Sequence, residues 1–218
     1  MKVYETDKLR NLIVAGHRGA GKTSLVEGML FATGGSTRLG RVEEGTSTCD
    51  YSPEEIDRKI SIQSALAYVE TDGCKVNLID TPGFGELLGE VISTIAAADA
   101  LLLVLDATGG VEVMTEQVWN LARAKSAPSV AFVNKLDKEN TDFDASLAQL
   151  KEAFQGVTFA PAVIPMGSAA DFKGVVDVLS GKAYTFAGGK ETEGPVPAEY
   201  ADAMATAKEA LTDRKSVV

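Results

Sequence analysis

A glycine-rich octapeptide places the strongest constraint on how this chain can fold. Eight consecutive residues fit the pattern G-x-x-x-x-G-K-[ST]: Gly16, His17, Arg18, Gly19, Ala20, Gly21, Lys22 and Thr23. The apolar run Leu12 to Ala15 precedes them and a helical pattern follows, which is the strand–loop–helix context that this pattern requires. In such a loop, the glycines let backbone N–H groups turn inward and bind phosphate oxygens at a helix N-terminus. The octapeptide therefore predicts a nucleotide-binding loop.

The rest of the chain alternates apolar runs with helical periodicity. This alternation predicts an α/β fold, with a mostly parallel sheet and helices on both faces. Strands are expected at residues 11–15, 75–80, 100–106, 130–134 and 162–165. Their near-continuous Val, Leu and Ile content suits parallel strands buried on both sides. Residues 61–70 are less uniformly apolar and predict an edge strand.

Two apolar stripes at spacings of three and four predict helices that pack on a core. The stripes are Leu88, Val91, Ile92 and Ile95, and Phe143, Leu147, Leu150 and Phe154. Residues 34–59 form a long polar segment with little periodicity. Such a segment is either disordered or functional, and its place between the loop helix and the edge strand favours a mobile switch.

Composition narrows the classes of partner. The chain has 218 residues, with 21 Lys and Arg against 31 Asp and Glu, so its net charge is −10. This negative excess argues against a broad nucleic-acid-binding surface on this segment. Cys49 and Cys74 fit no metal-binding spacing, and no apolar stretch is long enough to cross a membrane. The polar start, Met1 to Arg10, lacks the apolar core of a signal peptide, so a cytoplasmic location is expected.

The character of the sequence changes after Pro165. The expected elements are short strands at residues 171–186, a Gly- and Pro-rich connector at 187–197 and a helix at 197–211. We therefore expect a domain core over residues 1–170 and a small appended subdomain over residues 171–212. The last six residues, Asp213 to Val218, are interpreted either as an exposed tail or as a non-native tail.

A second motif ends the apolar strand at residues 75–80. It consists of Asp80, Thr81, Pro82 and Gly83. The Asp80 side chain is expected at the C-terminal edge of the sheet, where ligands of such folds bind. Together with the Thr23 hydroxyl it is expected to hold Mg²⁺, while Lys22 and the Gly83 N–H meet the terminal phosphates. Alone the motif is only a good turn sequence, but after a phosphate-binding loop it predicts a sensor of the γ-phosphate.

A third motif specifies the base. It follows another apolar strand and consists of Asn134, Lys135, Leu136 and Asp137. The Asp137 carboxylate can accept hydrogen bonds from guanine N1–H and N2–H₂ together, a pairing that adenine does not offer. The methylene stem of Lys135 is expected to lie along the base plane. In this order, the three motifs predict a P-loop GTPase fold that binds GTP or GDP together with Mg²⁺.

Colinear with these motifs, the chain resembles the GTP-binding domain of elongation factor G, a translational GTPase. The resemblance extends from Arg10 to about Leu211 and includes two further strings, residues 116–119 and 171–177. It implies hydrolysis of GTP to GDP and phosphate, coupled to ribosomal translocation or a related step, with the ribosome as partner of the full-length protein. It also implies a partial α+β insertion subdomain and a fifth GTPase motif beyond residue 218. We therefore expect the parent protein to continue and this segment to bind nucleotide less well than an intact domain.

Several positions depart from the family pattern. Phe84 stands where the family carries the histidine that positions the attacking water, and His17 is the only histidine of the chain. A phenyl ring neither exchanges protons nor hydrogen-bonds to water, and loss of such a group costs about 10²–10⁴-fold in rate. Ser61 keeps the switch hydroxyl that closes the Mg²⁺ shell, whereas Gly19 replaces an aspartate of the family and puts a monovalent-cation site in doubt. Arg58 is either a solvated side chain or a source of charge for the transition state.

Two alternatives stay open on the sequence alone. The first is a GTP-binding regulatory switch with little hydrolysis, which the replacement at Phe84 suggests. The second is an ATP-using P-loop enzyme, which Asp137 disfavours because its carboxylate pairs with guanine and not with adenine.

Overall fold

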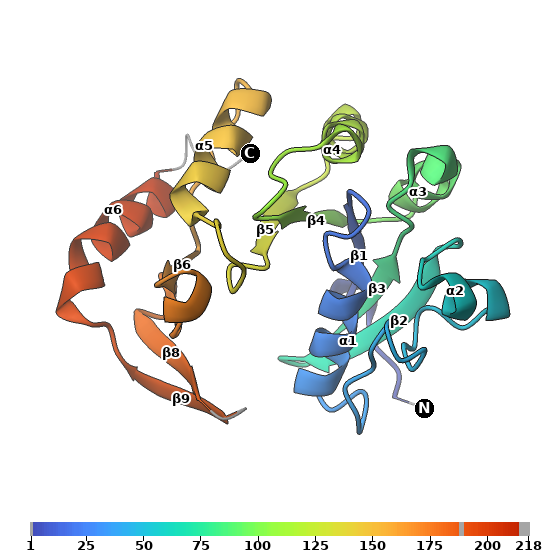
Figure 1. Cartoon of the computed structure of the whole chain (residues 1–218), viewed down its shortest axis with the longest axis horizontal. Coiled ribbons are helices and arrows are strands. Elements are labelled where there is room, and N and C mark those ends of the chain that lie inside the picture. Colours follow the sequence, from blue (N-terminus) through green and yellow to red (C-terminus); the bar gives the residue numbers. More distant parts are fainter. Residues whose placement is uncertain (1, 188–189, 214–218) are drawn as a thin grey trace. The chain divides into compact units, whose positions relative to one another are not determined.

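The computed structural model of the chain describes residues 2–187 and 190–213 (Figure 1). Its internal contacts divide the chain into two compact units. The first holds Met1–Asp106 and Glu112–Asn134, and the second holds Ala107–Val111 and Lys135–Val218. The domain boundary expected near residue 170 stays a prediction. The tail expected at residues 213–218 lies, apart from Asp213, outside the described residues.

The first unit is built on a five-stranded sheet with the strand order β2-β3-β1-β4-β5. In chain order the strands are β1 (Leu9–Gly16), β2 (Ala65–Thr71), β3 (Cys74–Asp80), β4 (Ala100–Asp106) and β5 (Ser129–Asn134). β1 pairs in parallel with β3 and β4, and β4 pairs in parallel with β5, whereas β2 is antiparallel to β3. The mostly parallel sheet is confirmed. The edge strand expected within residues 61–70 is also confirmed, although it begins only at Ala65.

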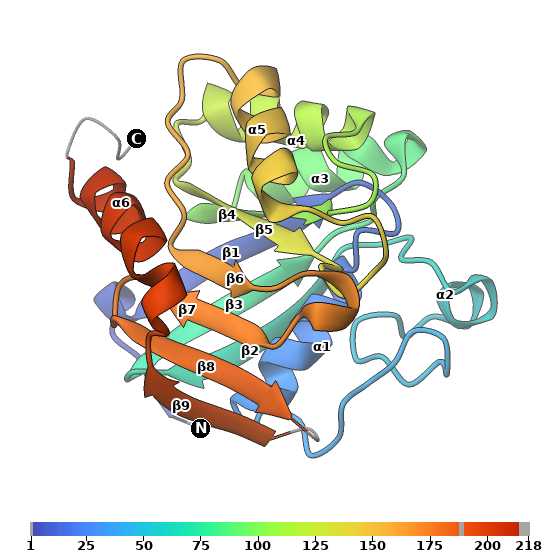
Figure 2. The same cartoon turned by 60° about the vertical axis from the view of Figure 1, so that its left-hand side comes forward.

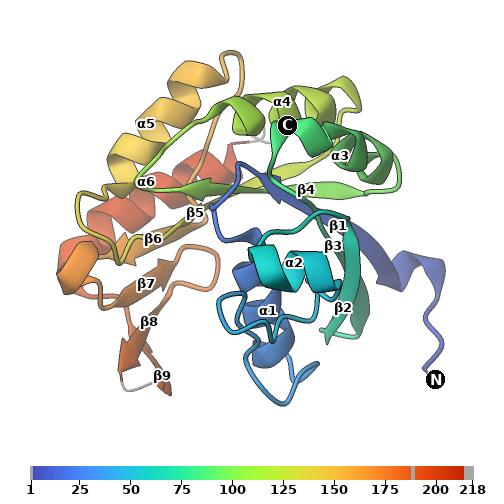
Figure 3. The same ribbon diagram turned by 45° about the vertical axis from the view of Figure 1, so that its right-hand side comes forward.

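Helices cover both faces of this sheet (Figure 3). The helices of the first unit are α1 (Lys22–Ala32), α2 (Pro53–Arg58), α3 (Leu88–Ile95) and α4 (Val113–Ala124). On one face, Val26 and Leu30 of α1 join a buried cluster with strand residues such as Val104. α3 and α4 lie on the opposite face (Figure 3). Leu101 to Leu105 of β4 are at most 6% exposed, and burial from both sides explains their unbroken apolar run.

Both apolar stripes expected from residue spacing lie on helices, but one residue does not reach the core. On α3, Val91 and Ile95 are buried, whereas Ile92 is 49% exposed. On α5 (Phe143–Ala153) and at its C-terminal end, Leu150 and Phe154 are buried. The spacing therefore identifies the helices correctly, and Ile92 marks the solvent-facing border of its stripe.

The long polar segment expected at residues 34–59 contains one short helix, α2, which its weak periodicity does not predict. The Ser52 hydroxyl accepts a hydrogen bond from the N–H of Glu55, and the Glu55 carboxylate accepts one from the N–H of Ser52. This capping box, with Pro53 in the first turn, starts a helix without an apolar stripe. Apart from α2, the segment has turns and bends but no regular strand among its described residues.

The second unit contains a four-stranded antiparallel sheet with the order β6-β7-β8-β9 (Figure 2). Its elements are α5, already given, β6 (Val163–Met166), β7 (Gly174–Asp177), β8 (Lys182–Ala187), β9 (Lys190–Pro195) and α6 (Ala201–Thr212). Short 3-10 helical turns span Thr6–Lys8 and Gly85–Leu87 in the first unit, and Ala169–Asp171 and Ala198–Tyr200 in the second. Tyr200 and Met204 at the α6 end pack against Met166, Val176 and Ala183 of the sheet.

Two expectations for this region are wrong. The strand expected at residues 162–165 does not join the parallel sheet, because β6 pairs antiparallel with β7. Its outer residue Val163 is 45% exposed while Met166 is buried, the one-sided burial that antiparallel sheets allow. The connector expected at residues 187–197 contains β9, whose polar residues give no apolar alternation. Pairing with β8, including an ion pair of 2.7 Å between Lys182 and Glu193, holds this edge strand.

Candidate nucleotide-binding site

The glycine-rich loop connects the end of β1 to the start of α1, as the sequence predicts. β1 ends at Gly16 and α1 begins at Lys22. Gly21, which caps the helix, has φ 90°, a left-handed conformation that favours glycine. A Cβ atom at Gly21 would also collide with the side-chain amide of Asn134. The loop thus requires glycine at this position for its backbone and for its packing.

Lys22 is a buried cation inside this loop. Its side chain is 6% exposed, and Nζ donates a hydrogen bond of 2.9 Å to the carbonyl oxygen of His17. Burial lowers the pKa of Lys22 to about 8, although the carboxylates of Asp80 and Asp50 act in the opposite direction. A poorly solvated ammonium group at a helix N-terminus is suited to bind an anion such as a phosphate.

Thr23, Ser61 and Asp80, the three residues predicted to hold a metal, lie together. The Thr23 hydroxyl donates to Asp80 Oδ2 over 2.7 Å and lies 3.1 Å from the Ser61 hydroxyl. The Ser61 hydroxyl in turn donates to Asp50 Oδ1 over 2.7 Å. The site therefore has a fourth oxygen-bearing side chain, Asp50, which is 4% exposed.

The four side chains fit a Mg²⁺ ion. Oδ1 of Asp80 and Oδ2 of Asp50 are buried and have no hydrogen-bond partner among the described residues. Burial raises the pKa of Asp80 to about 7, against the opposing effects of the Thr23 hydroxyl and Lys22, and it also raises the pKa of Asp50. A divalent cation would satisfy both orphaned oxygens and compensate both charges. In the described part of the chain, no cluster of three or more His, Cys, Asp or Glu residues suggests a different metal site.

The Asp80–Gly83 motif packs directly against the glycine-rich loop. Thr81 donates hydrogen bonds from its N–H (3.2 Å) and its hydroxyl (2.9 Å) to the carbonyl oxygen of Val14. A Cβ atom at Gly83 would collide with Lys22 Nζ and would lie 2.6 Å from the Arg18 backbone nitrogen. Like its neighbour Pro82, Gly83 is buried. The motif and the loop thus converge at Lys22, where the motif predicts contact with a terminal phosphate.

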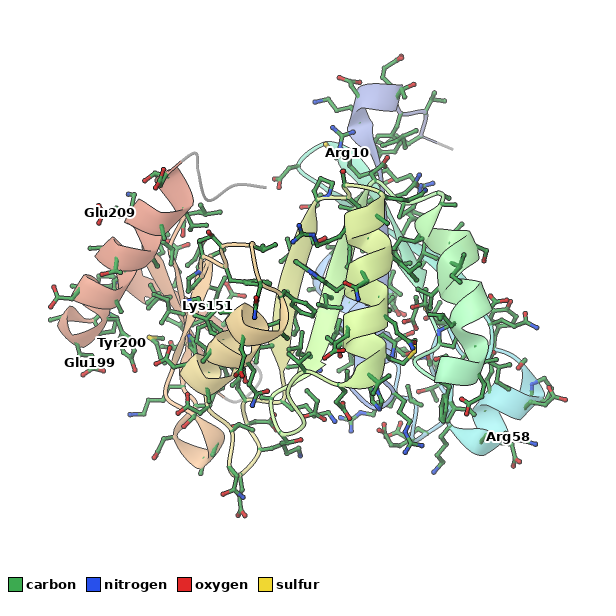
Figure 4. The ribbon with its side chains drawn as sticks, turned by 90° about the horizontal axis from the view of Figure 1, so that it is seen from above. Arg10, Arg58, Lys151, Glu199, Tyr200 and Glu209 are labelled. Carbon is green, nitrogen blue, oxygen red and sulfur yellow. The ribbon has the colours of Figure 1, made fainter. Side chains whose placement is uncertain are left out.

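The position after this motif carries an aromatic ring. Phe84 is partly exposed, and the Arg18 guanidinium carbon lies 5.4 Å from its ring centroid. The chain's one histidine does not replace it, since His17 Nε2 pairs with Glu112 Oε1 over 3.3 Å. Arg58, considered above as a source of charge, is exposed at the end of α2 and projects outward (Figure 4).

Two buried carboxylates anchor the segment that carries Asp50 and Ser61. Glu27 of α1 is fully buried and accepts hydrogen bonds from the N–H of Thr48 (2.5 Å) and the hydroxyl of Ser47 (3.2 Å). Glu55 is 2% exposed, and its Oε1 accepts from the N–H groups that directly follow Ser61, those of residues 62 (2.9 Å) and 63 (3.1 Å). These anchors hold the segment next to the Thr23 hydroxyl.

Sequence reasoning missed Asp50, Glu27 and Glu55. The one signal of Asp50 and Glu27 is that they are acidic, and 31 residues of the chain share it, whereas Glu55 also ends the S-x-x-E capping pattern that begins at Ser52. Burial separates these three from the solvated carboxylates, and burial here comes from the fold of an irregular segment onto α1. No periodic pattern encodes that contact.

The third motif is divided between the two units. Asn134 ends β5 in the first unit, and its side-chain amide donates 2.8 Å to the carbonyl oxygen of Ala20 in the glycine-rich loop. In the second unit, the carbonyl oxygen of Leu136 accepts a hydrogen bond of 2.7 Å from the N–H of Ala169. Lys135 has φ 63°, and the Asp137 side chain is 66% exposed. The roles of Lys135 and Asp137 in base recognition stay predictions.

The sheet, the glycine-rich loop and the buried Lys22, Thr23 and Asp80 define a P-loop nucleotide-binding fold. The sequence model of the family described as the elongation factor Tu GTP binding domain matches residues 7–197. The chain belongs to this family. Of the described residues, none forms a helix that is long and apolar enough to cross a membrane.

Relatives with this domain agree with the resemblance noted from the motifs. Elongation factor G of Mycoplasma genitalium is 37% identical over 204 residues, which cover 92% of this chain and 30% of the relative. Elongation factor G-like protein of Thermotoga maritima is 38% identical over 194 residues, or 89% of this chain and 28% of the relative. A crystal structure from Thermus thermophilus superposes with a TM-score of 0.84 at 36% identity, covering 92% of this chain and 30% of that one. The resemblance and the α/β fold class are confirmed, and the chain spans about 30% of the length of these relatives.

Proposed function

We propose that this chain is the GTP-binding domain of an elongation factor G-like translational GTPase. In the full-length protein it would couple GTP binding and hydrolysis to ribosomal translocation or a related ribosomal step in the cytoplasm. The observation that carries the proposal is the convergence of Lys22, Thr23, Asp80 and Gly83 at the end of the glycine-rich loop. The family membership and the elongation factor G relatives support it.

The proposed nucleotide contacts follow from the chemistry of each group. Backbone N–H groups of residues 16–23 and the Lys22 ammonium would bind the phosphates, and the Gly83 N–H would meet the γ-phosphate. Asn134 would fix the loop through Ala20, and Asp137 would read the guanine edge. Each contact matches a donor with a phosphate oxygen or an acceptor with a guanine N–H.

Thr23, Ser61 and Asp80 are the proposed Mg²⁺-binding residues, and Asp50 completes the oxygen-bearing set. When bound, Mg²⁺ supplies positive charge that compensates the β- and γ-phosphates during in-line attack by water. Ser61 and Asp50 lie on the segment anchored by Glu27 and Glu55. These anchors would therefore set how readily the segment closes over the nucleotide.

A second candidate function is a regulatory switch that binds GTP and hydrolyses it slowly. Phe84 favours this candidate, because its ring cannot orient or deprotonate water. His17 does not compensate, since its imidazole pairs with Glu112 on the neighbouring segment. Both candidates share the same nucleotide site and differ only in turnover.

Turnover by the full-length protein separates the two candidates. GTP hydrolysis is measured with and without ribosomes for the natural sequence and for Phe84→His. The control is Phe31→His, which places a new histidine on a 50%-exposed position of α1. If hydrolysis limits the natural protein, Phe84→His raises the ribosome-stimulated rate by roughly tenfold or more and the control does not. Fast ribosome-stimulated hydrolysis by the natural sequence would eliminate the slow switch, and failure to bind GTP would overturn both candidates.

A further inference from the structure

Arg18 occupies an unusual position in the glycine-rich loop. Its backbone nitrogen approaches Gly83 so closely that a Cβ atom on Gly83 would lie 2.6 Å from it. The same Cβ atom would also collide with Lys22 Nζ. Its guanidinium carbon lies 5.4 Å from the centroid of the Phe84 ring, a cation–π contact. Arg18 is therefore tied through its backbone and its side chain to the segment predicted to sense the γ-phosphate.

Within the part of the chain that the structure describes, the positive charge of Arg18 has no carboxylate partner. Among residues 2–187 and 190–213, no Asp or Glu forms an ion pair with Arg18, whereas Arg41 pairs with Glu44 over 3.8 Å. Glu112, which lies beside this loop, pairs with His17 instead, and Asp80 accepts a hydrogen bond from Thr23. An exposed guanidinium that has no carboxylate partner among the described residues, on the same loop as the buried Lys22 ammonium, favours an anion at this place.

The Phe84 ring restricts where this guanidinium can go. A long arginine side chain samples many rotamers in solvent, and stacking on an aromatic face reduces that freedom. The planar fork of N–H donors then remains free at its edge, where it can bind two phosphate oxygens at once. Phe84 thus has a role that needs no polar atom, because its ring positions the guanidinium of Arg18.

We propose that Arg18 binds the γ-phosphate and that Phe84 positions it, so that the Arg18–Phe84 pair makes this chain distinguish GTP from GDP. The inference rests on the proposed function, because it assigns a role at the same nucleotide site. GDP lacks the group that Arg18 would contact. The pair therefore strengthens binding of the triphosphate without strengthening binding of the diphosphate. Unlike a role in activating water for hydrolysis, this binding role of Arg18 and Phe84 requires no proton transfer.

The test compares the affinities of GDP and a non-hydrolysable GTP analogue, measured by calorimetry with Mg²⁺ present. Arg18→Ala is expected to lower the affinity for the analogue roughly 10- to 100-fold, because a charge-assisted contact is lost. The affinity for GDP is expected to change by no more than about twofold. Phe84→Leu keeps an apolar side chain but removes the ring, so it is expected to weaken the analogue less, with GDP unchanged. Arg18→Lys, which keeps the charge without the fork, is expected to fall between Arg18→Ala and the natural sequence.

Arg10→Ala is the matched control. Arg10 is an exposed arginine, labelled in Figure 4, near the start of β1, the strand whose other end leads into the glycine-rich loop. It is expected to change neither affinity. If the natural chain binds GDP and the analogue, and Arg18→Ala weakens both equally or neither, the inference is wrong while the proposed function stands. If the natural chain binds neither nucleotide, the proposed function fails and the inference fails with it.

Discussion

Replacing Glu55 by glutamine tests how the segment that carries Ser61 is held. The carboxylate accepts three backbone hydrogen bonds, two at Oε1 and one at Oε2. A glutamine of the same shape can place its carbonyl oxygen where Oε1 lies. Its NH₂ group then takes the place of Oε2 and faces the Ser52 N–H, so that two donors oppose each other. One hydrogen bond to a charged acceptor is lost in a site that is 2% exposed. The expected loss of unfolding free energy is about 1.5–3 kcal/mol.

The assay is urea unfolding followed by the fluorescence of Trp119, the single tryptophan, which is buried in the same unit. The equivalent fall in Tm is roughly 3–12 °C for a chain of this size. Glu54→Gln is the control, because Glu54 is the exposed neighbour in the first turn of α2. It loses at most a small helix-dipole contribution of about 0.3–1 kcal/mol.

The dependence on pH gives a second check on Glu55. Burial acts to raise its pKa, but the three N–H donors outweigh burial and hold the pKa below its ordinary value of 4.5. The carboxylate therefore stabilises the fold fully above pH 4.5, and this contribution is lost as the pH falls through the folded-state pKa. The gap between the natural chain and Glu55→Gln should be largest at neutral pH and shrink in acid. An effect of Glu55→Gln no larger than that of Glu54→Gln, or a gap independent of pH, would refute the assignment.

Two further substitutions probe the contacts of the glycine-rich loop. Gly83→Ala places a methyl group against Lys22 Nζ and the Arg18 backbone, so we expect affinity for a GTP analogue to fall by at least roughly tenfold in calorimetry; unchanged affinity would mean that this turn does not approach the phosphates. Asn134→Ala removes the amide that donates to the Ala20 carbonyl, so we expect the free energy of unfolding in urea to fall by about 1 kcal/mol. We also expect weaker binding of both GDP and GTP. Loss of GTP binding alone would contradict this scaffolding role.

The parts of the fold that the sequence predicts are those encoded by local pattern. The buried strand β4 shows as an unbroken apolar run, and the loop from Gly16 to Thr23 shows as fixed glycine spacing. Both signals are short-range. Burial from two sides determines the residue types of consecutive strand positions, and a phosphate-binding turn at a helix start does the same for consecutive loop positions. Thr23 and Asp80 are predicted as metal ligands by short motifs of the same kind, Ser61 is added by the family resemblance, and the structure brings the three side chains together.

What the sequence does not reveal depends on contacts between distant segments. Asp50 meets Ser61 only because α2 and its capping box turn the chain back, and Glu27 matters only because an irregular loop folds onto α1. Strand β9 is polar on both faces and exists through pairing with β8, so composition alone resembles a connector. In each case the deciding energy comes from tertiary burial or pairing and not from local propensity.

The central claim, that this chain is specific for guanine nucleotides, is tested most directly by competition between nucleotides. Affinities for GTP, ATP and XTP analogues are measured on the natural chain and on Asp137→Asn, with Asp144→Asn, an exposed position of α5, as the control. An asparagine can accept from N1–H but opposes the guanine amino group, and it can donate to the oxygen that xanthine carries there. The account predicts that GTP binds well above ATP, that Asp137→Asn weakens GTP roughly 10- to 100-fold and strengthens XTP, and that the control changes nothing. Binding of ATP as tight as or tighter than that of GTP would contradict it.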